Sequence, residues 1–247
     1  MAEFPHDRIK PFSETQGKKQ QVGEMFDRIA ARYDFMNRFL SAGIDITWRK
    51  KAINFLKPCK PQHILDVATG TADMAIKAAK MLHPQKIVGI DISEKMLAIG
   101  RSKVKKERLE HIVELRSGDG ETINFDDGTF DAVMVAFGVR NFENLEQGLR
   151  EIQRVLKHGG VLVVLEFSKP SLPLIKQLYQ FYMSTVAPEM ARWFNQNKKA
   201  YQYLNESANA FPDRQQFTTI LSKVGYSDTS FKPLSLGICC IYTGKKL

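Results

Sequence analysis

Short apolar runs alternate with helical stretches through the middle of this 247-residue chain. The apolar runs, which read as strands, cover residues 63–68, 86–91, 112–117, 131–137 and 160–167. The stretches between them have apolar side chains at helical spacing, at 72–82, 94–108 and 143–157. This alternation is typical of a mostly parallel sheet that helices cover on both faces. The sequence therefore predicts an α/β protein with a Rossmann-like sheet.

After residue 169 the pattern changes twice. Residues 172–211 carry many bulky apolar groups but no strand pattern, so we expect a helical insertion there. A helix at 213–224 and strand-like runs at 226–232 and 236–243 follow. These two runs lie too close in sequence for a parallel crossover, so they should form an antiparallel hairpin. We therefore expect seven strands, mostly parallel, with an antiparallel last strand.

The residues before the first strand fall into a polar segment and a segment with a helical pattern. Residues 1–21 are polar, and we expect them to form a flexible arm. Residues 22–58 follow a helical pattern, with Met25, Ile29 and Tyr33 on one face, and we interpret them as an N-terminal helical lid. We treat residues 22–247 as one domain, which is long enough to bury a substantial core.

The chain is basic, with a formal net charge of +9. This balance favours anionic partners such as nucleic acid or an acidic membrane surface, although a solvated basic surface gives the same count. The three cysteines form no CxxC pair and fit a reducing cytoplasm. There is no secretory segment, and no run approaches the roughly 20 apolar residues that cross a bilayer. We expect a cytoplasmic protein whose membrane contact, if any, is transient and peripheral, at the inner face of the cell membrane.

Two consecutive strand-like runs end near an acid and small residues. Residues 64–73 read Ile-Leu-Asp-Val-Ala-Thr-Gly-Thr-Ala-Asp, and the next run ends on Asp91. The loop around Gly70 lets a ligand approach the N–H groups at a helix start, and Asp91 can bind a ribose. Asp119, between two glycines after the third run, can accept a hydrogen bond from an adenine amino group. These acids predict a site for a nucleoside-containing cofactor.

The loop does not fit a dinucleotide. Two of the three glycines of the Gly-x-Gly-x-x-Gly pattern are missing, and Asp66 would repel a pyrophosphate. The same carboxylate suits an ammonium group, and a cationic ligand with a ribose points to S-adenosylmethionine. Each acid also has a structural alternative. Asp66 can cap local N–H groups, Asp91 can cap a helix although Ser93 is a better cap, and Asp119 can be a turn residue.

Further motifs carry a family resemblance. Residues 137–141 read Phe-Gly-Val-Arg-Asn, and residues 165–170 read Leu-Glu-Phe-Ser-Lys-Pro. Residues 33–37 and 201–207 add Tyr-Asp-Phe-Met-Asn and Tyr-Gln-Tyr-Leu-Asn-Glu-Ser. The loop at 64–73, Asp91, Gly118-Asp119-Gly120, Phe130-Asp131 and the run at 154–160 resemble the class I S-adenosylmethionine-dependent methyltransferases, and the motifs at 33–37, 137–141, 165–170 and 201–207 narrow this resemblance. Within that class, they are similar to the ubiquinone/menaquinone biosynthesis C-methyltransferase family from Val22 to the C-terminus.

The resemblance implies carbon methylation of a polyprenylated quinol, as in the conversion of demethylmenaquinol to menaquinol. Carried over to this sequence, cofactor contacts fall on Thr71, Asp91, Asp119 and Gly120. The chain departs from the family pattern at two positions. Ala72 replaces a loop glycine and should narrow the approach to the backbone, and Ala136 replaces a serine that supplies a cofactor contact in many members.

Such a reaction needs stabilisation of a quinol oxyanion and a path for two protons. The resemblance implies that Arg140 and Asn141 act with Tyr33 on the quinol. Arginine is a poor base, so Arg140 would stabilise the quinolate or polarise a water that Asn141 orients. Tyr33 would donate to a ring oxygen. The structural alternative for Arg140 is an ion pair with Glu143 or Glu166.

The sequence also leaves other acceptors and another function open. The acceptor could be a benzoquinol of ubiquinone biosynthesis, another small aromatic, a sterol or RNA, and the protein could be a cofactor-binding regulator without turnover. We expect no nucleic-acid partner, because no arginine-rich arm or stacking aromatic cluster is present. The five histidines are scattered without carboxylates at ligand spacing, so we expect no metal site. The insertion at 172–211 can cover a lipid-like substrate or form a homodimer face.

Overall fold

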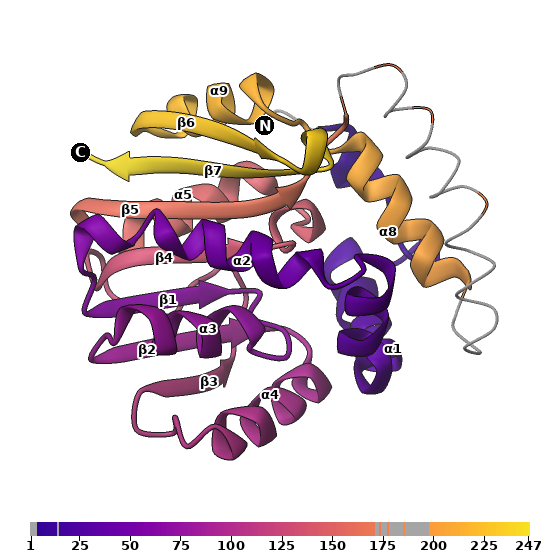
Figure 1. Ribbon diagram of the computed structural model, residues 1–247. Coiled ribbons are helices and arrows are strands. Elements are labelled where there is room, and N and C mark those ends of the chain that lie inside the picture. The colour runs from indigo at the N-terminus through magenta and orange to yellow at the C-terminus, as the bar shows by residue number, and fades with distance from the viewer. Residues whose placement is uncertain (1–3, 14, 171–172, 174–176, 178–184, 186–197) are drawn as a thin grey trace.

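The computed structural model describes residues 4–13, 15–170, 173, 177, 185 and 198–247. Its centre is a seven-stranded sheet in the order β3-β2-β1-β4-β5-β7-β6 (Figure 1). The strands are β1 (His63–Val67), β2 (Lys86–Asp91), β3 (Val113–Ser117), β4 (Phe130–Ala136), β5 (Leu156–Phe167), β6 (Tyr226–Leu234) and β7 (Cys239–Lys246). The first five pair in parallel, and β7 pairs antiparallel with both β5 and β6. The predicted sheet and its antiparallel hairpin are confirmed.

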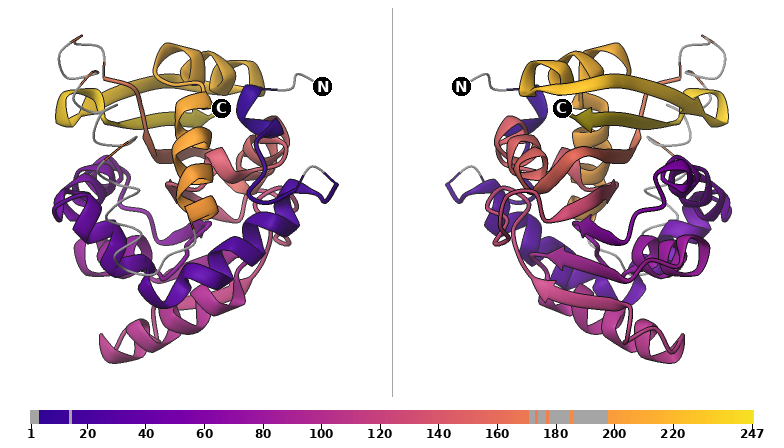
Figure 2. Two further views of the ribbon diagram at one scale, coloured as in Figure 1. Left: turned by 90° about the vertical axis from the view of Figure 1, so that its right-hand side faces the viewer. Right: turned by 90° about the vertical axis from the view of Figure 1, so that its left-hand side faces the viewer.

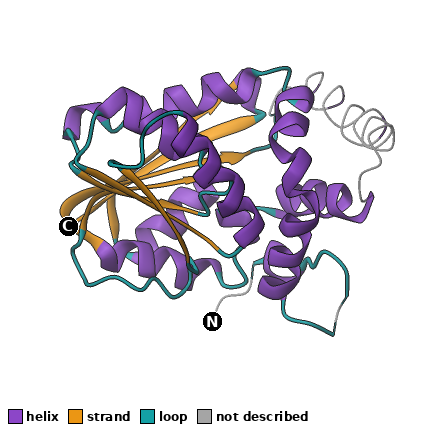
Figure 3. Ribbon diagram, turned by 90° about the horizontal axis from the view of Figure 1, so that it is seen from below, coloured by secondary structure: helices purple, strands orange, loops and turns teal. Residues whose placement is uncertain are grey.

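Helices cover both faces of the sheet (Figure 3). One face carries α2 (Ile44–Asn54), α3 (Asp73–Leu82) and α4 (Glu94–Lys106), and the other carries α5 (Leu145–Val155) and α9 (Gln215–Val224). Short 3-10 turns are η1 (Pro5–Arg8), η2 (Lys57–Cys59), η3 (Val139–Asn141) and η5 (Ser235–Gly237). The two helical layers explain why the central strands are apolar without alternation, since both of their faces are buried.

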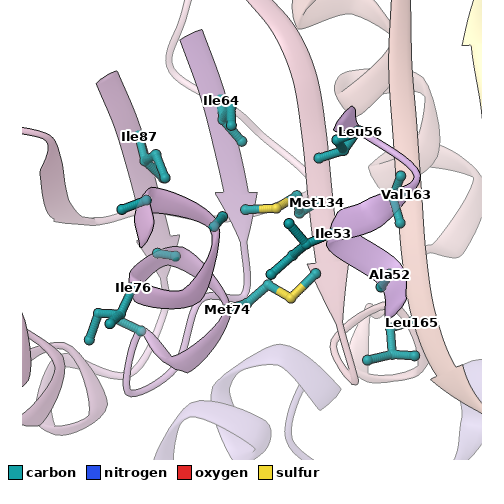
Figure 4. Close-up of a cluster of buried hydrophobic side chains, with 14 of the residues drawn as sticks. Ala52, Ile53, Leu56, Ile64, Met74, Ile76, Ile87, Met134, Val163 and Leu165 are labelled. Atoms are coloured by element: carbon teal, nitrogen blue, oxygen red, sulfur yellow. The ribbon is translucent and has the colours of Figure 1, made fainter. Parts of the chain in front are cut away.

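Strand β4 shows how one run of residues serves two cores. Side chains alternate along a strand, so Met134 faces one layer while Val133 and Val135 face the other. Figure 4 shows Met134 packed against Ile53 of α2 and Met74 of α3. All of these side chains are at most 2% exposed. Because both faces of β4 are packed in this way, the strand and the loop that follows it are held in a fixed position.

The ends of the parallel strands are covered by α1 (Lys18–Leu40) and α8 (Lys198–Ala210) (Figures 1 and 2). These helices form a third apolar cluster that includes Met25, Ile29, Ala200 and Tyr203. The predicted N-terminal helical segment is therefore present, as α1 and α2 separated by a turn at Gly43 with φ +76°. Residues 198–210 of the predicted insertion are helical, and most of 172–197 lies outside the described residues.

The described part of residues 1–21 is not a flexible arm, so that prediction is wrong. The side chain of Lys18 is fully buried, and its Nζ donates to the backbone oxygens of His6 (2.8 Å), Arg140 (3.1 Å) and Phe142 (2.8 Å). An ammonium has three donors, and here all three are satisfied by carbonyl groups. These bonds hold the polar N-terminal residues against the edge of the sheet.

Two further boundaries differ from the prediction. Helix α5 ends at Val155, and β5 begins at Leu156 rather than at residue 160. Its first residues pair with β4 through an irregular register between Phe130 and Ala132. None of the helices in the described ranges combines the length and the hydropathy that a membrane span requires.

Candidate active site

A cleft opens at the carboxyl ends of β1, β2 and β4, under α1. Six of the nine predicted site residues line it: Tyr33, Gly70, Asp91, Asp119, Gly120 and Asn141. The remaining wall is mostly apolar and includes Val22, Phe26, Ile92, Met96, Phe137 and Phe142. The parallel topology explains this convergence, because the loops after neighbouring strands meet at one edge.

Asp91 connects the two loops at the floor of the cleft. Its Oδ2 accepts the N–H of Gly70 at 2.8 Å, and its Oδ1 accepts the N–H of Ser93 at 2.9 Å. Ser93, not Asp91, caps α4 through the N–H of Met96. Burial raises the pKa of Asp91 to about 6, against the lowering effect of these backbone donors. A carboxylate has about four lone-pair sites, so two remain for the hydroxyls of a ribose.

The loop after β1 exposes its backbone at Gly70. This residue has φ +55°, and a Cβ built on it would meet no atom within 4 Å. Ala72 also has a left-handed φ of +65°, which explains why related loops place glycine here. However, Ala72 is fully buried and its methyl group faces Gly100 of α4. The expectation that Ala72 narrows the approach to the cleft is therefore wrong.

The adenine-binding end predicted around Asp119 is tightly built. A Cβ at Gly120 would lie 2.8 Å from Cγ1 of Val67 and 2.9 Å from Cζ of Phe142, so the position requires glycine. Asp119 makes its own turn by accepting the N–H of Glu121 at 2.9 Å. Its Oδ2 also accepts a hydrogen bond from Nζ of Lys19 at 2.6 Å. The turn alternative for Asp119 and a position on the cleft wall thus coexist.

Lys19 is a cleft residue that the sequence interpretation missed, because it belonged to the predicted arm. Its ammonium bridges Asp119 and Glu121, with a distance of 3.6 Å to Oε2 of Glu121. Glu121 in turn accepts the N–H of Glu143 at 2.8 Å. The first turn of α1 therefore closes the Asp119 end of the cleft through charged contacts.

Asp66 and Thr71 lie behind the cleft rather than in its wall. Asp66 is 1% exposed and accepts a hydrogen bond from Oγ1 of Thr69 at 2.7 Å, and burial raises its pKa to about 7. Thr71 donates to Oδ1 of Asp34 in α1 at 2.6 Å. Both residues support the loop and its contact with α1. For Asp66 this is the structural alternative that the sequence left open.

Arg140 is also behind the wall. It is 3% exposed and pairs with Glu166 at 2.6 Å, while Nη1 also donates to the backbone oxygen of Phe137 at 2.8 Å. Glu166 is fully buried, and its Oε2 has no hydrogen-bond partner among the described residues. The ion-pair alternative for Arg140 is thus present in the structure.

The charge of Arg140 nevertheless reaches the cleft. Burial raises the pKa of Tyr33, while a hydrogen bond with Asn37 and the positive charge of Arg140 lower it. Burial likewise raises the pKa of Tyr203, and Arg140 again opposes this effect. Arg140 therefore provides positive potential at two hydroxyl groups, that of Tyr33 in the cleft wall and that of Tyr203 behind Asn141.

Asn141 is held in place from two sides. Its Nδ2 donates to the backbone oxygen of Phe137 at 3.3 Å, and its Oδ1 accepts the hydroxyl of Tyr203 at 3.1 Å. Tyr203 is 1% exposed and comes from α8. It lies in the 201–207 motif, which carried the resemblance without indicating this contact. A structural contact between α8 and η3 cannot be read from spacing in the sequence.

These residues fit S-adenosylmethionine. The cleft offers acceptors for a ribose at Asp91, an open backbone at Gly70 and an apolar wall at Ile92 and Phe142 for a flat ring. Within the described ranges, no group of three or more His, Cys, Asp or Glu side chains is arranged to hold a metal ion. The fold and this site define a class I methyltransferase, whose methyl donor is S-adenosylmethionine.

The chain belongs to the ubiE/COQ5 methyltransferase family, whose model matches residues 14–246. It is 46% identical over 243 residues to a demethylmenaquinone methyltransferase of Bacteroides fragilis, covering 98% of this chain and 99% of that protein. It is 43% identical over 230 residues to a ubiquinone/menaquinone biosynthesis C-methyltransferase of Geobacter sulfurreducens, covering 93% and 90%. The structure also resembles a solved S-adenosylmethionine-dependent methyltransferase from Thermotoga maritima, with a TM-score of 0.65 and 18% sequence identity. The alignment covers 92% of this chain and 100% of that chain and supports the fold.

Cofactor affinity should depend on pH through Asp91. Ribose hydroxyls donate to the ionised carboxylate, so binding favours the form that exists above the raised pKa of about 6. The dissociation constant for S-adenosylhomocysteine should stay flat from pH 8 to 7 and rise below pH 6, approaching about tenfold per pH unit. Calorimetric titration across this range checks the curve. The Asp91→Asn variant should bind weakly with a flat profile, and an unchanged slope in that variant would assign the titration to another group.

Proposed function

We propose that this protein transfers a methyl group to a ring carbon of a polyprenylated quinol, and that its substrate is demethylmenaquinol and its product menaquinol. The observation that carries this proposal is the 46% identity, over nearly both full chains, with a protein named demethylmenaquinone methyltransferase. Relatives named for both ubiquinone and menaquinone biosynthesis support the benzoquinol as the second candidate acceptor.

The reaction forms one bond and breaks one bond. Bound S-adenosylmethionine supplies a methyl group on a positively charged sulfur. The ring carbon forms the new carbon–carbon bond with its own electron pair, and the bond from sulfur to methyl breaks, leaving S-adenosylhomocysteine. The quinol loses a hydroxyl proton before this step and a ring proton after it, and its oxygen takes one proton back, so one proton is released for each menaquinol formed.

We propose that Asp91 and Gly70 bind the donor, while Asn141 and Tyr33 contact the quinol ring. Tyr33 and Asn141 both line the cleft, and the amide of Asn141 is oriented by Tyr203. Tyr33, whose pKa is raised by burial, stays protonated near neutral pH and can donate to a ring oxygen. Arg140 stabilises the developing quinolate through its charge, without contact in this structure.

The protein is also proposed to work at a membrane surface as a peripheral protein, because a polyprenyl tail partitions into lipid. The apolar part of the cleft wall near Ile92 and Phe26 is compatible with such a substrate.

One assay tests the proposed reaction. Purified protein is incubated with methyl-labelled S-adenosylmethionine and either reduced demethylmenaquinone or a reduced benzoquinone precursor, each in detergent. We expect label in menaquinone, and faster than in the benzoquinone product. Oxidised demethylmenaquinone is the matched control and should accept no label, because its ring carbon is not electron-rich. Label in neither lipid with the reduced acceptors would rule out the assignment.

A further inference from the structure

The surface that runs from the second half of α1 over the turn into α2 is both basic and apolar. We call residues 28–51 the α1–α2 corner. This segment contains six basic residues and only two acids, Asp34 and Asp45. Both acids face inward: Asp34 binds Lys103 and Thr71, and Asp45 is buried against Arg49. The outward charges of the corner are therefore positive.

Large exposed apolar side chains gather at the same place. Phe35 is 53%, Phe39 43%, Ile44 45% and Ile46 37% exposed. The described residues contain eight such side chains, so half of them fall within twelve consecutive positions. The rings of Phe35 and Phe39 are parallel, with centroids 5.8 Å apart. Isolated exposed apolar residues are ordinary, but a cluster of this kind marks a contact surface.

The spacing of residues along α1 places basic and aromatic side chains on one face of the helix. Arg28, Arg32, Phe35 and Phe39 follow each other at intervals of four, three and four residues, which is the spacing of neighbours on a helix surface. Lys50 and Lys51 add exposed ammonium groups on α2. An aromatic patch beside cations is the composition of a surface that lies in a membrane interface.

The corner also adjoins the cleft. Tyr33 lines the cleft and belongs to the same helical turn as Phe35. Ile92, which also lines the cleft, is 37% exposed. Residues two positions apart on a helix point about 200° apart, so Phe35 lies on the outer side of the helix whose inner side lines the cleft.

We propose that the α1–α2 corner is the face with which this protein docks on a bilayer of anionic lipids. Its exposed cations Arg28, Arg32, Lys50 and Lys51 contact lipid phosphates, and Phe35, Phe39 and Ile44 enter the boundary between headgroups and acyl chains. A second copy of the chain is a poor occupant, since a symmetric contact would bring like charges together. A nucleic acid would bind the cations but leave the apolar side chains in water. The proposal rests on the proposed function for its substrate, but its test needs no turnover.

Vesicle flotation with the full-length protein tests the docking face. Vesicles of 70% phosphatidylcholine and 30% phosphatidylglycerol should bind the protein at 0.1 M salt, while pure phosphatidylcholine should bind it at least tenfold more weakly. Charge reversal in Lys50→Glu/Lys51→Glu should weaken binding at least tenfold, since each cation near such a surface contributes about fivefold. Lys105→Glu/Lys106→Glu on α4 is the matched control, with the same charge change and an effect below twofold.

The apolar half of the face is tested separately. Phe35→Ser/Phe39→Ser should weaken vesicle binding at least tenfold, whereas Phe231→Ser on β6 should change it less than twofold. Equal binding by the corner and control variants would overturn the proposal. So would RNA binding that competes with vesicles and depends on Lys50 and Lys51 but not on Phe35 and Phe39.

Activity separates this proposal from the proposed function. The corner variants should methylate a water-soluble quinol with a one-isoprene tail at the wild-type rate, because none of the exchanged residues lines the cleft. They should lose activity when the long-tailed quinol is embedded in anionic vesicles. If no quinol is methylated by the wild-type protein while vesicle binding still depends on the corner, the docking face stands and the assigned reaction fails. A corner variant that turns over vesicle-embedded quinol at the wild-type rate contradicts the docking face.

Discussion

Arg140→Met is expected to lower kcat at least about 100-fold while leaving the affinity for S-adenosylhomocysteine within threefold. The variant removes positive charge from behind Tyr33 and Asn141, the two residues proposed to contact the quinol, and lost oxyanion stabilisation has effects of this size. Affinity should hold because Arg140 does not line the cleft. Single-turnover kinetics and calorimetric titration measure the two quantities separately.

The same variant should also lose stability. Glu166 is fully buried beside Arg140, and removal of one partner of a buried ion pair costs about 3–5 kcal/mol. The double variant Arg140→Met/Glu166→Gln removes both charges and should recover most of the free energy of unfolding. Its kcat should remain low. If kcat returns together with stability, Arg140 has a structural role alone and its catalytic role is refuted.

Asp91→Ala should weaken binding of S-adenosylhomocysteine at least about 100-fold. The variant removes the proposed acceptor for the ribose hydroxyls and also the acceptor for the N–H groups of Gly70 and Ser93. Hydrogen bonds to a charged group contribute about 1.5–3 kcal/mol each, so the loss of two explains the expected size. Calorimetric titration gives the dissociation constant.

Asp66→Asn is the matched control for Asp91. It is an aspartate on the neighbouring strand and is also buried, but its side chain faces Thr69 rather than the cleft. We expect its dissociation constant to change less than tenfold. A stronger effect at Asp66 than at Asp91 would move the nucleoside away from the position proposed here.

The sequence was sufficient for the sheet and for the acids at its edge. Because β4 is buried on both faces, its residues are apolar without alternation, and this pattern is visible in the sequence. Asp91 lies at the end of β2, a strand of the same kind. Parallel strands then bring their carboxyl ends together without further information. For this reason the order of residues along the chain is enough to predict that Gly70, Asp91 and Asp119 share one cleft.

Other residues depend on contacts that no local pattern records. Lys18 and Lys19 read as part of a solvated segment, because only the folded chain brings the carbonyls of His6 and Phe142 and the carboxylate of Asp119 to them. The position of Arg140 beside Glu166 is likewise accompanied by tertiary packing on Phe167, whose ring centre lies 5.3 Å from the guanidinium carbon.

Adjacent lysines at the start of α1 reach both halves of the site. Lys18 binds the carbonyls on either side of Asn141, and Lys19 binds the acid at the adenine end. A displacement of the first turn of α1 would therefore break its contacts with the turn that carries Asn141 and with Asp119 at the same time.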